Sequence, residues 1–317
     1  MSPVYTVNGP LAPDLLGTTL IHEHVMVDFG GAAITGPHRW DRDEVAGVML
    51  PHLQEIAGQG VSTLVECTPA YLGRDPELLR QLSGLTGLHI VTNTGLYKEP
   101  YLPDWAFDLD PAALAERWVA ESVDGIGETG IRPGFIKIAV NPGELLPIQR
   151  TIVRAAAITH CATGLGVMAH TGNAEAAHES LDLAEAEKMS PGRYIIAHAD
   201  QIGAGTQPGD PGWADVLAAH RSLLERGAWL EYDSIGWGPS DRHVALLVAM
   251  LDLGYETQLL ISQDAGWYHV GEPGGGNVQS LAGLIDDFVP ALRAAGVDTA
   301  TMTRLLVDNP ARVLAAP

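Results

Sequence analysis

The chain has 317 residues, of which 46% are hydrophobic and 18% charged, a composition typical of a globular protein with a large core. Its formal net charge of −21 at pH 7 argues against nucleic acids and anionic membranes as partners, because both bind basic surfaces. The apolar runs are too short to cross a bilayer and the first residues lack the pattern of a signal peptide, so we expect a cytoplasmic protein.

Short apolar segments alternate with segments of helical period along the chain. The strand candidates are Thr18–His22, Val61–Cys67, His89–Thr94, Gly134–Val140, Gly166–His170, Tyr194–His198, Ala228–Asp233 and Gln258–Asp264. The helix candidates are Arg42–Gly58, Asp75–Leu82, Asp110–Val123, Gln149–Thr163, Glu175–Lys188, Pro211–Glu225 and Arg242–Leu253. This alternation predicts an α/β fold, a (β/α)₈ TIM barrel that forms a single domain over residues 1–317. A doubly wound open sheet is the alternative, but no Gly-x-Gly-x-x-Gly turn follows the first strand candidate.

Two regions stand outside this alternation. Residues 1–16 carry the pattern of a short N-terminal hairpin that precedes the barrel and could close its bottom. Residues 266–279 form a Gly-rich stretch after the eighth strand candidate. This stretch lacks the Gly-Lys-Ser/Thr ending of a phosphate-binding loop, so we interpret it as a mobile lid or wall of a site.

The first strand candidate leads into a His-x-His pair, His22 and His24. Side chains alternate along a strand, so both imidazoles lie on one face and Glu23 lies on the other. Two imidazoles on one face of a strand can hold a metal ion, although two surface histidines would give the same pattern.

Further candidate ligands lie in or at the ends of later strand candidates. They are Lys137, His170, His198 and Asp264. Barrel enzymes carry their chemistry at the carboxyl ends of the strands, so these side chains are expected to converge with the histidine pair. Lys137 lies in an apolar strand, and because an unpaired buried ammonium is costly, it must lose its charge, find a partner or be modified.

These motifs resemble those of the phosphotriesterase family of the amidohydrolase superfamily, in particular its lactonase and homology-protein branch. The similarity covers nearly the whole chain. The matching segments are Gly17–His24, Thr94–Tyr97, Gly134–Ile138, Ala169–Thr171, Ile196–His198, Ser262–Gly266 and Asp308–Arg312.

The resemblance implies a binuclear metal centre inside a (β/α)₈ barrel. His22, His24 and Asp264 would bind the more buried ion, and His170 and His198 the more exposed one. Lys137 would carry CO₂ as a carbamate and bridge both ions together with a hydroxide, which resolves the problem of its buried charge. The cofactors are therefore expected to be two divalent ions, zinc first, with manganese, cobalt or iron as alternatives.

The resemblance also assigns roles around the centre. Asp264 would take a proton from the hydroxide and deliver it to the leaving group, although a ligand role alone stays open. Tyr97 would lie beside the metals, and Trp237, Trp267 and Tyr268 would form aromatic walls of the substrate pocket. Tyr97 could also be an ordinary aromatic residue at the barrel mouth.

Two departures from the family pattern weaken any case for organophosphate triesters. Ser234 follows Asp233 where phosphotriesterases have a histidine, and Gln263 precedes Asp264 where histidine is common. We therefore expect a hydrolase of a small-molecule lactone or related carboxylic ester. Amides such as N-acyl amino acids, and phosphoesters, are alternatives that the ligand set does not separate. A binding protein on a catalytically dead barrel is disfavoured because all six ligands are present, and a homodimer is expected from the resemblance alone.

Overall fold

A ring of short parallel strands forms the centre of the molecule. The computed structural model describes residues 2–238 and 240–316. The strands are β3 (Thr19–Val27), β4 (Thr63–Glu66), β5 (His89–Val91), β6 (Asn93–Thr94), β7 (Phe135–Ala139), β8 (Val167–His170), β9 (Tyr194–Ala197), β10 (Trp229–Tyr232), β11 (Leu259–Ile261) and β12 (Gly266–His269). They pair in the orders β12-β3-β4-β5 and β6-β7-β8-β9-β10-β11, and the pairs within both sheets are parallel.

Two of the barrel strands are interrupted, one as β5 and β6 and the other as β11 and β12. Each interrupted strand has one part in each sheet, so it joins the two sheets into one ring. The strands β5 and β6 are separated only by Thr92. Between β11, which pairs with β10, and β12, which pairs with β3, the N–H of Asp264 donates to the carbonyl of His22 at 3.1 Å. The N–H of His24 then donates to the carbonyl of Ala265 at 2.9 Å. The eighth strand therefore returns to the first, and the predicted (β/α)₈ barrel is confirmed; the doubly wound alternative is wrong.

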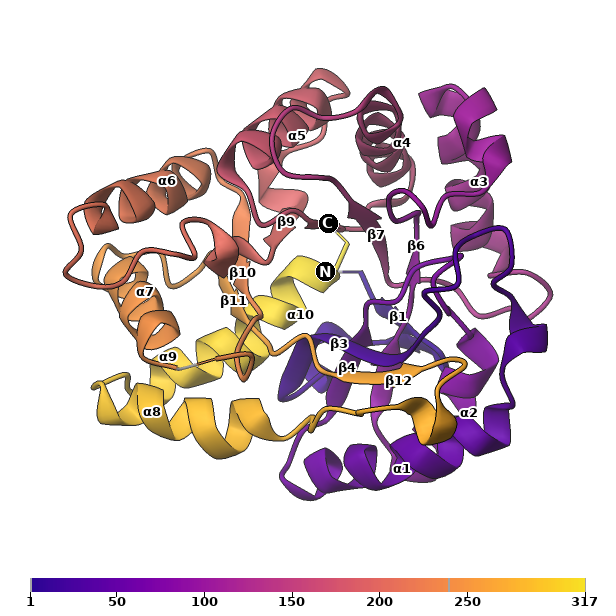
Figure 1. The fold of residues 1–317 in the computed structure, drawn as a ribbon, viewed down its shortest axis with the longest axis horizontal. Coiled ribbons are helices and arrows are strands. Elements are labelled where there is room, and N and C mark those ends of the chain that lie inside the picture. The colour runs from indigo at the N-terminus through magenta and orange to yellow at the C-terminus, as the bar shows by residue number, and fades with distance from the viewer. Residues whose placement is uncertain (1, 239, 317) are drawn as a thin grey trace.

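Helices surround this ring, as Figure 1 shows. They are α1 (Arg42–Gly58), α2 (Pro76–Thr86), α3 (Pro111–Asp124), α4 (Pro147–Thr163), α5 (Ala174–Ala186), α6 (Trp213–Glu225), α7 (Asp241–Asp252), α8 (Val289–Ala294), α9 (Thr299–Thr303) and α10 (Asn309–Leu314). The side chains of Asp75 and Asp110, each of which precedes a proline, accept hydrogen bonds from the first turns of α2 and α3. After the eighth strand the barrel is covered by the three short helices α8, α9 and α10, which the sequence analysis did not identify.

The apolar residues form two buried layers. One layer lies between the strands and the helices. The other fills the barrel and takes residues from around the whole ring, such as Ile21, Phe135 and Leu260. Val4 and Val313 belong to this inner cluster, so the N-terminal hairpin and α10 close one end of the barrel.

The predicted hairpin is confirmed, since β1 (Val4–Thr6) pairs antiparallel with β2 (Gly9–Leu11). The two ends of the chain meet beside it, where the N–H of Ser2 donates to the carbonyl of Ala316 at 3.1 Å (Figure 1). Among the described residues, no helix combines the length and apolarity needed to cross a membrane.

Two expectations about strand limits need correction. The first barrel strand does not end at the histidine pair, because β3 continues to Val27 and pairs there with β12. The Gly-rich stretch 266–279 is not only a loop, because it begins with β12 and continues in a short 3-10 turn, Pro273–Gly275. The physical reason is the same in both cases: an interrupted eighth strand supplies a hydrogen-bonding partner that extends the first strand.

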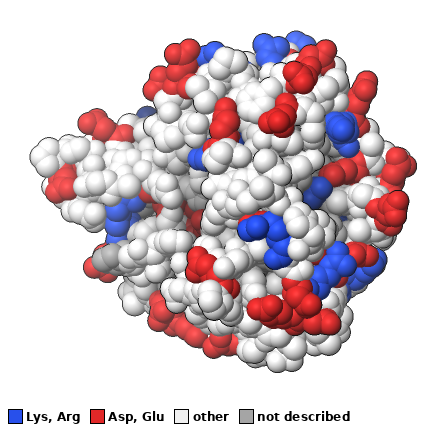
Figure 2. All heavy atoms as spheres, turned by 45° about the vertical axis from the view of Figure 1, so that its right-hand side comes forward, with Lys and Arg blue, Asp and Glu red and all other residues white. Residues whose placement is uncertain are grey.

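Charged side chains are spread over the surface. On the face drawn in Figure 2, basic side chains lie among acidic ones rather than in one continuous patch. This distribution agrees with the strongly negative net charge of the chain.

Gly266 is a test of the barrel closure. Its φ is +99°, and a Cβ at this position would collide with the backbone oxygen of His24. Gly254 has a similar φ of +86° but nothing within 4 Å of the same added atom. We expect Gly254→Ala to lower the free energy of unfolding by about 1–2 kcal/mol, and Gly266→Ala by about 3 kcal/mol or more, in chemical denaturation. Equal losses in the two variants would contradict this account of the closure.

Candidate metal centre

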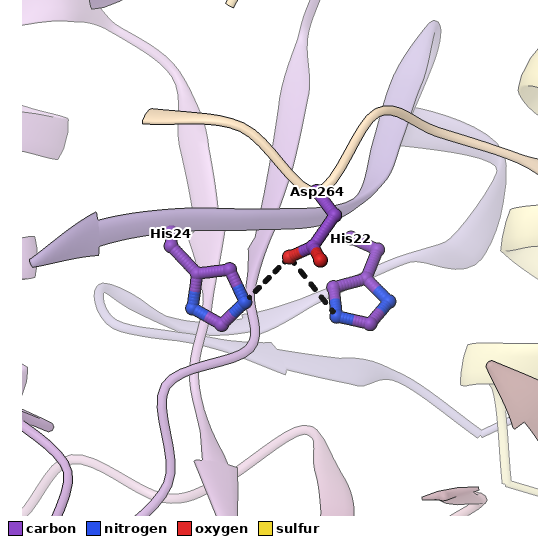
Figure 3. A group of neighbouring side chains, drawn as sticks. All are labelled: His22, His24 and Asp264. Atoms are coloured by element: carbon purple, nitrogen blue, oxygen red, sulfur yellow. Dashed lines mark ion pairs between the residues drawn. The ribbon is translucent and has the colours of Figure 1, made fainter. Parts of the chain in front are cut away.

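The centre begins with His22 and His24 on β3. Both side chains are buried, and their rings point to the same side of the strand, as the alternation predicted (Figure 3). Asp264 reaches them from the segment between β11 and β12. Its Oδ1 lies 2.9 Å from Nε2 of His24 and 3.8 Å from Nε2 of His22. Three potential metal-binding atoms therefore converge from two neighbouring strands.

The opposite face of β3 holds Asp264 in place. The carboxylate of Glu23 is fully buried and accepts hydrogen bonds from Ser262 Oγ at 2.7 Å and from the N–H of Ala265 at 2.9 Å. The same Ser262 Oγ accepts from the N–H of His22 at 3.0 Å. Glu23 thus ties both ends of the segment that contains Asp264, whose φ of +49° is uncommon for a residue with a side chain.

Lys137 extends from β7 into the same cluster. Its side chain is 1% exposed, and its Nζ lies 2.9 Å from Nε2 of His22. No carboxylate lies within ion-pair distance of this ammonium in residues 2–238 and 240–316. The cost of burying the Lys137 ammonium, which the sequence already indicated, is therefore not offset by an ion pair among the described residues.

His170 and His198 complete the cluster from the ends of β8 and β9. Their ring centroids are 4.3 Å apart, and the ring of His198 lies 5.0 Å from that of His22. His198 has a φ of +56°, which turns its side chain inward after the last residue of β9. The fold therefore brings together all six residues that were predicted as ligands.

Asp233 at the end of β10 orients two of these histidines. One of its oxygens lies 2.7 Å from Nδ1 of His198, and the other lies 3.0 Å from Nδ1 of His22. Nδ1 of His24 is 2.8 Å from Thr68 Oγ1. With Nδ1 occupied in this way, Nε2 is the ring nitrogen that remains for a metal ion.

The sequence analysis did not identify these supporting residues. Asp233 was noted only as the aspartate of the seventh strand, and Thr68 was not considered. Glu23 was expected on the outer face of β3, but its role there was missed. Glu231 of β10, whose Oε2 lies 3.3 Å from Nδ1 of His22, was missed as well. The signal available for Glu23 and Glu231 was an acidic residue inside an apolar strand, the same kind of signal that singled out Lys137.

Burial and neighbouring charges keep most of the potential ligand atoms in the cluster unprotonated. Burial lowers the pKa of His22, His24 and His170, so these rings are neutral near pH 7. Burial also acts to lower the pKa of His198, but the charge and hydrogen bond of Asp233 outweigh it and raise that pKa. Burial alone would raise the pKa of Asp264, and the adjacent histidines instead lower it. The carboxylate is therefore ionised and able to bind a cation.

The unsatisfied atoms of the cluster fit a metal ion. Oδ1 of Asp264 is buried and accepts no hydrogen bond of good geometry, although Nε2 of His24 is close. His22, His24 and Asp264 form a group whose ligand atoms all lie within 4.8 Å of one another. A second such group, His22, His198 and Asp233, is explained by the Nδ1 contacts of Asp233. Imidazole and carboxylate ligands suit zinc and neighbouring transition metals.

A cavity of about 510 Å³ opens beside the cluster. Trp237 and Trp267 line it together with Asp264, as predicted for two of the aromatic walls. The ring of Trp267 also packs on His24, with centroids 4.1 Å apart. On the other side of the cluster, the hydroxyl of Tyr97 lies 3.1 Å from Nδ1 of His170, so Tyr97 is placed beside the centre as expected.

The prediction for Tyr268 is wrong. Its side chain is 5% exposed, and its hydroxyl donates to Glu44 of α1 at 3.1 Å. Because Trp267 and Tyr268 are consecutive in β12, their side chains leave the strand on opposite faces. Only Trp267 faces the site.

The chain is similar to known proteins over nearly its whole length. Residues 2–314 match the Phosphotriesterase family. The chain is 29% identical to the "Phosphotriesterase homology protein" of Mycobacterium tuberculosis over 336 residues, which cover 99% of this chain and 98% of that protein. It is 23% identical to an "N-acetyltaurine hydrolase" of Danio rerio over 355 residues, covering 98% and 97%. A solved variant of a PTE-like lactonase from Deinococcus radiodurans superposes with a TM-score of 0.85 at 29% identity, covering 98% of this chain and 99% of that one.

Replacing Asp233 tests whether it orients the ligands. We expect Asp233→Ala to weaken metal binding by about 10–100-fold, because the rings of His22 and His198 lose the carboxylate that fixes their Nδ1 atoms. The measurement is metal retained per chain during dialysis against a graded chelator.

The matched control is Asp75→Ala, which removes another buried carboxylate, the cap of α2, whose other partners are Trp40 and Arg42 rather than residues of the cluster. This control should lose stability but keep its metal affinity. A similar loss of metal affinity in both variants would show that Asp233 acts only through general stability.

Proposed function

Because the chain belongs to the phosphotriesterase family, we propose that it is a binuclear metal-dependent hydrolase that acts on a lactone or a related carboxylic ester. The observation that carries this proposal is that His22 and His24 lie next to Oδ1 of Asp264, a buried carboxylate oxygen that accepts no hydrogen bond. The remaining ligands of the family pattern, Lys137, His170 and His198, lie in the same cluster.

The residues present fit two ions. His22, His24 and Asp264 would hold the more buried ion, and His170 and His198 the more exposed one. When bound, the pair supplies Lewis-acid activation of water and of the scissile carbonyl group. Zinc is the first choice for this ligand set, with manganese, cobalt and iron as alternatives.

Lys137 is proposed to be carbamylated by CO₂. A carbamate is an anion, so it would replace a buried unpaired cation with a group that bridges two divalent ions. The position supports this, because Nζ is 2.9 Å from a ring nitrogen of His22 and no ion pair compensates its charge among the described residues.

The protein groups around the centre divide the remaining work. The carboxylate of Asp264 is the proposed acceptor that takes a proton from the attacking water and passes it to the leaving group. The backbone of Asp264 is held by Glu23 through Ser262 and Ala265, so the carboxylate needs little reorganisation. Tyr97 packs against His170 at the open side, and Trp267 covers His24.

The choice of a lactone or ester rests on residues around the substrate pocket rather than on the metal ligands. Tyr97 matches the tyrosine of the lactonase branch, and Ser234 replaces the histidine of the phosphotriesterases. An amide substrate is the second candidate, and it is favoured by the similarity to a protein described as an N-acetyltaurine hydrolase. Phosphoesters follow, since related Deinococcus radiodurans structures are described as an organophosphorus hydrolase. A homodimer and a cytoplasmic location remain proposals from the resemblance and the sequence.

A panel of lactones tests the proposal directly. Acyl-homoserine, aliphatic and sugar lactones would be offered to metal-reconstituted protein, with acid release followed by a pH indicator. We expect turnover that Lys137→Ala abolishes and that a short carboxylic acid partly restores in that variant, because the acid can replace the carbamate. Full activity of Lys137→Ala would contradict the bridging role, and silence on lactones with turnover of N-acyl amino acids would move the substrate to amides.

Asp264→Asn tests the proton-transfer role. We expect kcat to fall by about 10²–10⁴, since a positioned acid–base group contributes this much and the amide accepts no proton. The metal content of the variant is measured in parallel, because Asp264 is also a proposed ligand. A loss of kcat below about tenfold in protein that keeps its metals would reduce Asp264 to a ligand.

A further inference from the structure

Lys98 is a cation at the edge of the cluster that the proposed chemistry does not use. It follows Tyr97 in the segment after β6, and its Nζ lies 3.0 Å from Nε2 of His170. Nζ also lies 5.5 Å from the centroid of the Tyr97 ring. The side chain is partly buried, and no ion pair of Lys98 with a carboxylate is formed within residues 2–238 and 240–316. The adjacent Glu99 attracts this ammonium without forming an ion pair with it, so its charge is only partly compensated.

The other cations near the site are already engaged. Arg242 lines the 510 Å³ cavity, but its guanidinium donates to the backbone carbonyls of Asp200, Ile202, Gly203 and Thr206. Lys137 lies inside the cluster. Of these three cations, Lys98 is therefore the one that is free to meet a charge on the substrate.

Binding of a metal ion at His170 would change the position of Lys98. An ion at Nε2 of His170 would displace Nζ from its present contact. The four-carbon stem of lysine lets the ammonium move while it stays at the rim.

A substrate carboxylate would remove the cost of this arrangement. Once an ion at His170 displaces it, the partly buried ammonium loses its hydrogen-bond partner, and an anion that reaches it would restore a charge-assisted hydrogen bond. The chain as a whole carries a net charge of −21, which repels anions at long range. A local cation at the site is then required if an anionic substrate is to bind.

We propose that Lys98 binds a carboxylate group of the substrate while the scissile bond lies at the cluster. The favoured substrates are then N-acyl amino acids or lactones that carry a free carboxylate, which would bind more tightly than neutral lactones of the same kind. This inference rests on the proposed function for the bond that is cleaved. The carboxylate recognition itself is a property of binding.

Calorimetry with a pair of probes in which a sulfonyl group replaces the scissile N-acyl group tests the proposal. N-methanesulfonylglycine carries the carboxylate, and N-methanesulfonylglycinamide is its neutral match. Both would be titrated into metal-loaded wild type and Lys98→Met. Lys188→Met is the control, because it makes the same change of charge at an exposed residue beyond the end of α5.

In the wild type we expect the carboxylate probe to bind at least about tenfold more tightly than the amide, as for a hydrogen bond to a charged group. Lys98→Met should reduce this ratio to within about twofold, and Lys188→Met should keep it. Lys98→Gln repeats the test with a polar neutral residue, should the methionine variant fold poorly.

A wild type that prefers neither probe, or binds neither, overturns the proposal, and so does a ratio that survives in both Lys98 variants. The outcome is separable from that of the reaction. Selective binding of the carboxylate probe by a protein that hydrolyses no ester, amide or phosphoester would leave the carboxylate site standing and refute the proposed hydrolase.

Discussion

The hydrogen bonds between β3 and the interrupted eighth strand determine the rest of the site. A regular eighth strand would pair with its neighbours and carry Asp264 past the histidines. Instead, the chain leaves β11, turns at Asp264 with a positive φ, and re-enters the barrel as β12. Glu23 accepts the hydrogen bonds that this interruption would otherwise leave unmade. One fully buried carboxylate on the outer face of β3 thus positions a carboxylate on the inner face.

This arrangement concentrates charge where solvent is absent. Glu23, Glu231, Asp233 and Lys137 are all buried around the histidines. Burial raises the pKa of Glu23 and of Glu231, which shows how costly two more anions would be here. Divalent cations at the cluster would compensate Asp264 and its neighbours. Residues with positive φ at His198, Asp264 and Trp267 add backbone strain, which is typical of functional sites.

The sequence was most informative where a polar residue interrupts an apolar strand near its end. Such positions predicted His22, His24, Lys137, His170, His198 and Asp264, because period-two alternation and the parallel barrel bring them to one place. The sequence was least informative where a strand forms only by pairing with a segment that is distant along the chain. The extension of β3 and the strand β12 depend on each other, and neither is visible alone. The error for Tyr268 has the same cause. Without β12 it could not be foreseen that Trp267 and Tyr268 are consecutive strand residues, whose side chains lie on opposite faces.

The number of divalent ions bound per chain tests the central claim most directly. Elemental analysis of the purified protein, after reconstitution with zinc and removal of loosely bound metal, gives this number. The account predicts about two ions per chain, one for each set of ligands in the barrel. Protein that folds as described and retains no metal would contradict it, because the buried carboxylate and imidazole atoms would then have another purpose.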